Sequence, residues 1–135
     1  SGWITSGPTL AKFEEELAEY CEVNKAVALN SATAAMELVL KVLGIEEGDE
    51  IITTPYTYTA TASVAIHRGI KPIFCDLAKD SFFMDYDKLS DLITEKTKVI
   101  MPVDFAGIPC DYDKIKKQRR YSYFSRFSPF IWSKV

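Results

Sequence analysis

The strongest constraint on the fold is a regular alternation of amphipathic helices with short apolar strands, which continues as far as Lys117. Apolar residues spaced three or four apart predict helices, and short apolar or β-branched runs between them predict strands. Such alternation with short connections is typical of an α/β domain, in which a mostly parallel sheet is covered by helices on both faces. Helices are predicted over residues 10–23, 34–43, 59–67, 85–93 and 111–117, and strands over residues 26–29, 51–54, 71–76 and 98–103.

Composition and charge limit the kinds of partner that this protein is expected to bind. The 135 residues suffice for one modest domain, and the formal charge of −3 does not favour nucleic acid as a partner. No apolar run approaches the roughly 20 residues of a membrane span. Three widely spaced cysteines, Cys21, Cys75 and Cys110, suit buried thiols in a reducing cytosol better than a disulfide framework or a metal site. We therefore expect a cytoplasmic protein without a metal, a nucleic-acid partner or a membrane anchor.

The first segment that could carry chemistry lies between the strand predicted over residues 26–29 and the helix that follows it. It reads NSATAA and contains only small residues after Asn30. Helix N-terminal N–H groups, with the hydroxyls of Ser31 and Thr33, could bind a phosphate there. The alternative is that Ser31 or Thr33 only caps the helix.

Two further segments follow predicted strands and could also face a ligand. Residues 53–61 place Tyr56 and Tyr58 where ligands collect in α/β sheets, so the two rings could stack on a flat molecule or simply pack. Asp104 precedes a glycine turn, and it could orient a ligand or hold that turn. His67 has no acid or cysteine at a useful spacing, which indicates a structural role. The dinucleotide fingerprint and the Walker phosphate loop are both absent.

Taken in order, several segments resemble the DegT/DnrJ/StrS-type sugar aminotransferases, which are pyridoxal-phosphate enzymes of the fold-type-I class. The resemblance covers residues 2–117 and implies the amino-terminal part of the three-layer large domain of such an enzyme, truncated. The segments that carry it read GWITSGP, FEEELAEY, VALNSATAAMELVL, GDEIITTPYTYTATASVAIHRG, KPIFCDLAKDSFFMD and TKVIMPVDFAGIPCDYD.

The resemblance also implies roles for individual residues. Thr33 and the backbone of Ala34 correspond to the contacts with the cofactor phosphate, and Ser31 belongs to the same loop. Ala32 stands where the family usually has glycine, which narrows the freedom of this loop. Tyr58 corresponds to the aromatic residue that stacks on the pyridine ring of pyridoxal phosphate.

Family members move an amino group from glutamate to a nucleotide-linked keto sugar, and they act as dimers with active sites at the subunit interface. The resemblance therefore implies these two substrates and a homo-oligomer. A fragment without the later strands would expose sheet edges and apolar faces, so we also expect self-association.

Two groups that the family's chemistry requires have no counterpart here. The lysine that forms the Schiff base lies well downstream of the matched region, and the aspartate that keeps the pyridine nitrogen protonated belongs on the strand after the helix that starts near Asp111. Lys114, Lys116 and Lys117 belong to a solvated helix pattern and do not correspond to that lysine. We therefore expect no catalytic residue in this chain and no transamination by it. Two alternatives remain open: a non-catalytic interaction module and one half of a split aminotransferase.

Residues 118–135 depart from the pattern and read QRRYSYFSRFSPFIWSKV. One permitted set of codons for this segment, read after its first base is dropped, translates as KEDIPILVDSAHSFGAK. That product contains an apolar strand followed by an acid, and it resembles the family's aspartate segment. We therefore interpret residues 1–117 as the family domain and residues 118–135 as out-of-frame translation. The alternative is a basic and aromatic extension of the kind that binds nucleic acid.

Overall fold

The computed structural model describes residues 7–117 and 122–123, and these divide into two compact units at the bond between Ser31 and Ala32. The first unit contains helix α1 (Pro8–Tyr20), which has proline in its first turn, where the missing N–H costs nothing. No side chain of α1 is buried, although Cys21 immediately after it is. The extended segment that follows is held by a hydrogen bond of 2.8 Å from the Ala28 N–H to the Glu14 carboxylate.

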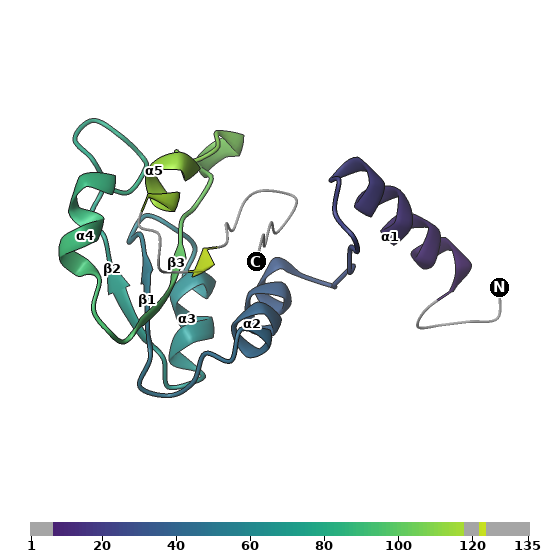
Figure 1. Cartoon of the computed structure of the whole chain (residues 1–135), viewed down its shortest axis with the longest axis horizontal. Coiled ribbons are helices and arrows are strands. Elements are labelled where there is room, and N and C mark those ends of the chain that lie inside the picture. Colours follow the sequence, from purple (N-terminus) through teal and green to yellow (C-terminus); the bar gives the residue numbers. More distant parts are fainter. Residues whose placement is uncertain (1–6, 118–121, 124–135) are drawn as a thin grey trace. The chain divides into compact units, whose positions relative to one another are not determined.

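The second unit is an α/β sandwich around a parallel sheet (Figure 1). The sheet order is β2-β1-β3-β4, and every neighbouring pair of strands is parallel. The strands are β1 (Glu50–Thr53), β2 (Lys71–Phe74), β3 (Thr97–Met101) and β4 (Ser122–Tyr123). The helices are α2 (Ala32–Val42), α3 (Ala60–Ile66), α4 (Leu89–Leu92) and α5 (Tyr112–Lys116), with short 3-10 turns η1 (Tyr86–Lys88) and η2 (Phe105–Gly107).

Two hydrophobic clusters, one on each face of the sheet, produce three layers. Because side chains alternate along a strand, Ile51 and Ile52 of β1 belong to different clusters. The cluster with Ile51 contains Met36 and Leu40 of α2, together with residues of α3. The cluster with Ile52 is covered by η1, α4 and α5. This arrangement confirms the predicted three-layer α/β/α fold.

The strand predicted over residues 26–29 was wrong: these residues form no strand in the structure. A strand requires a neighbour that completes its hydrogen-bond ladder, and none of the strands in the described ranges pairs with this segment. Val27 is 68% exposed, and Leu29 is also exposed. The helix predicted over residues 85–93 is instead η1 followed by the single turn of α4, and the first helix lies slightly earlier than predicted.

The three cysteines are buried and unpaired, which confirms the prediction of buried thiols. Among residues 7–117, no group of three or more histidine, cysteine or carboxylate side chains is placed to hold a metal. None of the helices in the same range is long and apolar enough to cross a membrane.

Candidate functional site

The candidate site lies at the edge of the sheet where the parallel strands end. The loops after β1, β2 and β3 all start from this edge, because the three strands run in the same direction. Ligands of open α/β sheets bind at the carboxyl ends of the strands, where such loops converge. Each of these loops carries aromatic residues, at positions 56 and 58, 82 and 83, and 105.

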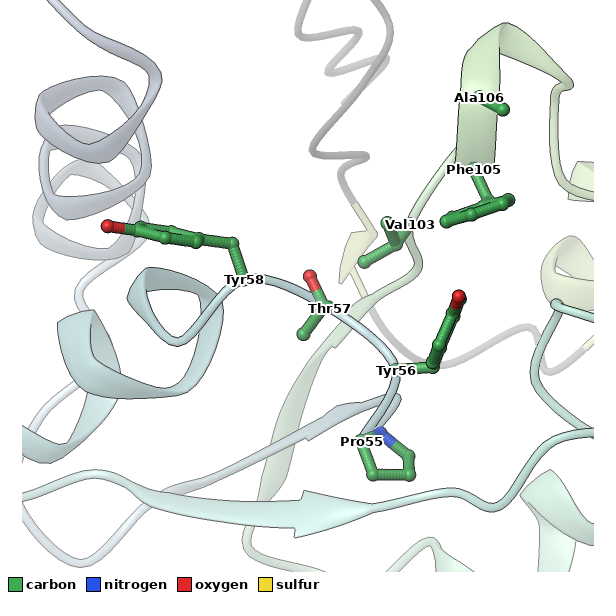
Figure 2. A pocket seen from close by; sticks show the side chains of 7 residues that line it. All are labelled: Pro55, Tyr56, Thr57, Tyr58, Val103, Phe105 and Ala106. Carbon is green, nitrogen blue, oxygen red and sulfur yellow. The ribbon is translucent and has the colours of Figure 1, made fainter.

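Local hydrogen bonds shape the loop after β1. The Thr54 hydroxyl accepts a hydrogen bond of 3.2 Å from the Tyr56 N–H, and the Thr57 hydroxyl lies 2.9 Å from that of Thr61 in α3. The loop therefore leaves the strand in a tight turn and is tied to the helix it enters. As Figure 2 shows, the ring of Tyr58 points away from the ring of Tyr56, and Tyr58 is 67% exposed.

Three aromatic rings from the three loops contact one another, and we call them the aromatic platform: Tyr56, Phe82 and Phe105. The ring centroids of Phe82 and Phe105 are 4.9 Å apart at an interplanar angle of 26°. Tyr56 lies 5.6 Å from Phe82 and 5.1 Å from Phe105. These separations are typical of favourable ring pairs, so the platform joins the three loops at the sheet edge.

A cavity of about 370 Å³ lies beside the platform (Figure 2). This volume falls within the usual range of small-molecule sites, roughly 300–1,000 Å³. None of the described residues that line the cavity carries a charge. The lining consists of the rings of Tyr56, Tyr58 and Phe105, with Pro55, Thr57, Val103 and Ala106 between them.

The buried side chain of Asp104 stabilises the loop after β3 through hydrogen bonds. Its side chain is 4% exposed and accepts hydrogen bonds from the Cys110 N–H at 2.8 Å and from the Tyr112 hydroxyl at 2.8 and 2.7 Å. Between these partners the chain reverses through Ala106 and Gly107, whose φ angles are +52° and +79°. An alanine in this left-handed region costs on the order of 1 kcal/mol, so other contacts must hold the turn. Asp104 supplies them through Cys110 and Tyr112, which favours the role in the turn over the other role that the sequence left open.

The buried thiol beside Asp104 favours its protonated form. Burial, with a smaller contribution from the negative charge of Asp104, raises the pKa of the Cys110 thiol to about 12. The protonated thiol donates a hydrogen bond of 3.2 Å to the Val103 carbonyl. Burial likewise raises the pKa of Cys75. Both thiols therefore belong to the core.

The predicted phosphate loop falls at the boundary between the two units. Ser31 is the last residue of the first unit, and Ala32, Thr33 and Ala34 form the first turn of α2 in the second. The first turn of a helix directs N–H groups toward its N-terminal end, where an anion binds. The side chains here are small, and Thr33 and Ala34 are partly buried.

Two of the predicted parts of the site, Tyr58 and the first turn of α2, lie at the starts of adjacent helices. Tyr58 lies just before α3, which packs against α2, so Tyr58 and the first turn of α2 mark the N-terminal ends of two adjacent helices. His67 lies at the end of α3 on the surface, with Nδ1 3.9 Å from the Glu37 carboxylate. Sequence reasoning missed Phe82 and Phe105, although an aromatic residue after each of three strands was a visible signal.

Known proteins resemble this chain both in sequence and in fold. The sequence model of the DegT/DnrJ/EryC1/StrS aminotransferase family matches residues 1–121. The chain is 44% identical over 115 residues to the spore coat polysaccharide biosynthesis protein SpsC of Bacillus subtilis. It is 46% identical over 115 residues to the UDP-4-amino-4-deoxy-L-arabinose–oxoglutarate aminotransferase of Shewanella sediminis. The match covers 85% of this chain and 30% of each relative, so the chain spans about a third of their length.

Solved structures agree with the sequence matches. A protein described as a sugar aminotransferase, Spr1654 from Streptococcus pneumoniae, superposes in its PMP form with a TM-score of 0.88 at 46% identity. The match covers 93% of this chain and 36% of that protein. NtdA of Bacillus subtilis, solved with its bound cofactor PMP, superposes with a TM-score of 0.86 at 32% identity, covering 93% of this chain and 29% of NtdA. The fold is therefore that of part of a fold-type-I aminotransferase.

Proposed function

This chain belongs to the DegT/DnrJ/EryC1/StrS aminotransferase family, and we propose that it is the part of such an enzyme that holds the phosphate and one ring face of pyridoxal phosphate. The observation that carries the proposal is the pairing of two features. One is the first turn of α2, built from Ala32, Thr33 and Ala34, and the other is the exposed ring of Tyr58 before the adjacent helix α3.

The residues present fit the phosphate of the cofactor. Ala32 and Ala34 have side chains too small to block the backbone, and α2 has 11 residues, enough for an N-terminus that attracts an anion. The Thr33 hydroxyl can donate a further hydrogen bond to a phosphate oxygen.

The residues present also fit the ring of the cofactor. Tyr58 offers a largely exposed aromatic face, which can stack on a flat heteroaromatic ring. Thr57 and Thr61, joined through their hydroxyls, fix the backbone on which Tyr58 stands. When bound, pyridoxal phosphate supplies the electron sink for amino transfer, and this chain's part is to bind and orient it.

We propose that these 135 residues do not transaminate by themselves. The family's Schiff-base lysine and ring-nitrogen aspartate have no counterpart among them. Lys114 and Lys116 of α5 lie on the surface and pair with Asp111 and Asp113 at 3.9 and 3.6 Å, as solvated helix residues do. The parent activity that we infer is amino transfer from glutamate to a nucleotide-linked keto sugar, in a cytoplasmic homodimer.

We also propose that residues 118–135 are out-of-frame translation of the family's next strand. The backbone of Ser122 and Tyr123 pairs in parallel with Val99 and Ile100, which marks where the strand after α5 belongs. In the shifted reading KEDIPILVDSAHSFGAK, the apolar run ILV falls at positions 123–125, almost the same place. The acid that follows it would then stand at the carboxyl edge of the sheet, where the family uses its aspartate.

A chimera tests the proposed function. Residues 1–117 of this chain would replace the matching part of Spr1654 from Streptococcus pneumoniae, and the cofactor content and transaminase activity would be measured. We expect a chimera that holds pyridoxal phosphate. Thr33→Ala should weaken cofactor binding about tenfold or more, because a hydrogen bond to a charged group is lost. Tyr58→Ala should weaken it about threefold to tenfold, because stacking is lost.

Two controls make the chimera decisive. Tyr58→Phe keeps the ring and should retain the cofactor, and Ser90→Ala changes an exposed hydroxyl on α4 and should have no effect. A folded chimera that binds no cofactor would show that residues 1–117 do not form this site. Equal affinity in the Thr33→Ala and Ser90→Ala variants would remove Thr33 from the phosphate contacts.

A further inference from the structure

We infer that the aromatic platform of Tyr56, Phe82 and Phe105 binds the sugar ring of the nucleotide-linked substrate through the apolar C–H face of that ring. The inference rests on the proposed function, because it places the substrate beside the cofactor. It assigns the platform a ligand different from that of Tyr58, although Tyr58 lines the same cavity as two rings of the platform, Tyr56 and Phe105.

The platform is built like a binding surface rather than like core packing. Its three rings come from the loops after three parallel strands and lie within 5.6 Å of one another. In a core such rings would be buried, but here Tyr56 is 44% and Phe82 is 55% exposed. Clustered aromatic surface that remains open at a ligand-binding edge indicates a site for an apolar ring face.

The absence of charge decides which part of a substrate can bind there. The described residues lining the cavity include no cation that could pair with a diphosphate, and no carboxylate that could pair with an amine. The chemistry that fits is an uncharged ring with one apolar face and some hydroxyl groups. The hydroxyls of Tyr56 and Thr57 can bond to those groups, and the ring of Phe105 can contact the apolar face. The ring of Phe82, stacked on Phe105 beside the cavity, extends this apolar surface.

Both the sugar and the pyrimidine base of a nucleotide sugar meet this description, and the position of Tyr58 favours the sugar. The side chain of Tyr58 belongs to the same loop as Tyr56 but points in the opposite direction, away from Tyr56 and Phe105 (Figure 2). A cofactor ring on Tyr58 would border the cavity that Tyr56 and Phe105 of the platform also line. The carbon that receives the amino group is on the sugar, so the sugar must be the part of the substrate nearest the cofactor.

Saturation-transfer NMR on this chain tests the inference, with UDP-glucose as a stable nucleotide-linked sugar. We expect the strongest transfer to the C–H protons of the glucose ring and weaker transfer to the uracil protons. Phe105→Ala and Phe82→Ala should each lower the affinity for UDP-glucose about threefold to tenfold, as expected for the loss of one ring contact. Phe82 is the more exposed of the two, so its variant should fold even if the other does not.

The matched control is Phe74→Ala, which removes a half-exposed phenylalanine at the end of β2 outside the platform and should leave binding unchanged. Separate titrations with uridine and with pyridoxal phosphate show whether the platform instead binds the base or the cofactor ring. The inference is wrong if transfer is strongest at the uracil protons, if both platform variants bind like the wild type, or if UDP-glucose does not bind. If the inference fails in this way but the chimera with Spr1654 still binds pyridoxal phosphate, the proposed function stands.

Discussion

Replacing Asp104 by alanine is expected to lower the free energy of unfolding by about 2–4 kcal/mol. The carboxylate is almost fully buried, and it accepts the Cys110 N–H and the Tyr112 hydroxyl. Without it, the buried Cys110 N–H and the partly buried Tyr112 hydroxyl lose this acceptor, and an unsatisfied buried group costs about 1–3 kcal/mol. The left-handed turn through Ala106 would also lose its restraint. Urea denaturation, followed by circular dichroism, measures the change.

Two further variants determine what the Asp104 result means. Tyr112→Phe removes one donor and leaves the carboxylate bonded to Cys110, so it should cost about 1 kcal/mol. Asp91→Ala removes an exposed carboxylate from α4 and should change the stability by no more than about 0.5 kcal/mol. If Asp104→Ala were no more destabilising than Asp91→Ala, Asp104 would not hold the loop.

Replacing residues 118–135 by KEDIPILVDSAHSFGAK is expected to raise the free energy of unfolding by about 2–5 kcal/mol. The shifted reading supplies an apolar strand where the backbone of Ser122 and Tyr123 now pairs with β3. Val99 and Ile100 of β3 are buried, and β4 beside them is the last strand in the order β2-β1-β3-β4. Burying two or three aliphatic side chains there contributes about 1.5–3 kcal/mol each, before the entropy of ordering them.

The control for the exchanged tail is a peptide of the same composition in which the ILV run is moved behind SAHSFG. It should leave the stability close to that of the original chain. An equal gain from both peptides would mean that composition rather than register is responsible. A coding sequence whose shifted frame does not continue into family sequence would refute the out-of-frame origin directly.

The fold was largely predictable because its signals are local. Ile51 and Ile52 stand in a β-branched run that has the length of a strand, and Met36 and Leu40 of α2 have the spacing of one helical face. These patterns depend only on residues close in the sequence, and the side chains that form them are buried against the sheet as expected. Residues 26–29 show the limit of this reasoning, because an apolar run becomes a strand only when another strand pairs with it.

The site was less predictable because its contacts join distant parts of the chain. Contact among Tyr56, Phe82 and Phe105 requires three loops to converge, and no periodic pattern in the local sequence predicts that contact. The hydrogen bond between Asp104 and Tyr112 likewise depends on how the chain turns at Ala106. Tyr58 was a candidate because it follows a predicted strand, and the family resemblance gave it a specific role. The structure adds that its ring points away from that of Tyr56.

We propose that this chain holds part of a pyridoxal-phosphate site but lacks the lysine that would bind the cofactor covalently. The most direct test is to add pyridoxal phosphate to the chain alone, record the absorbance spectrum, reduce with borohydride and map any modified lysine by mass spectrometry. We predict no stoichiometric lysine adduct and at most weak, reversible binding that Thr33→Ala reduces. One specific lysine of this chain, modified in a one-to-one ratio and conferring transamination, would contradict the claim.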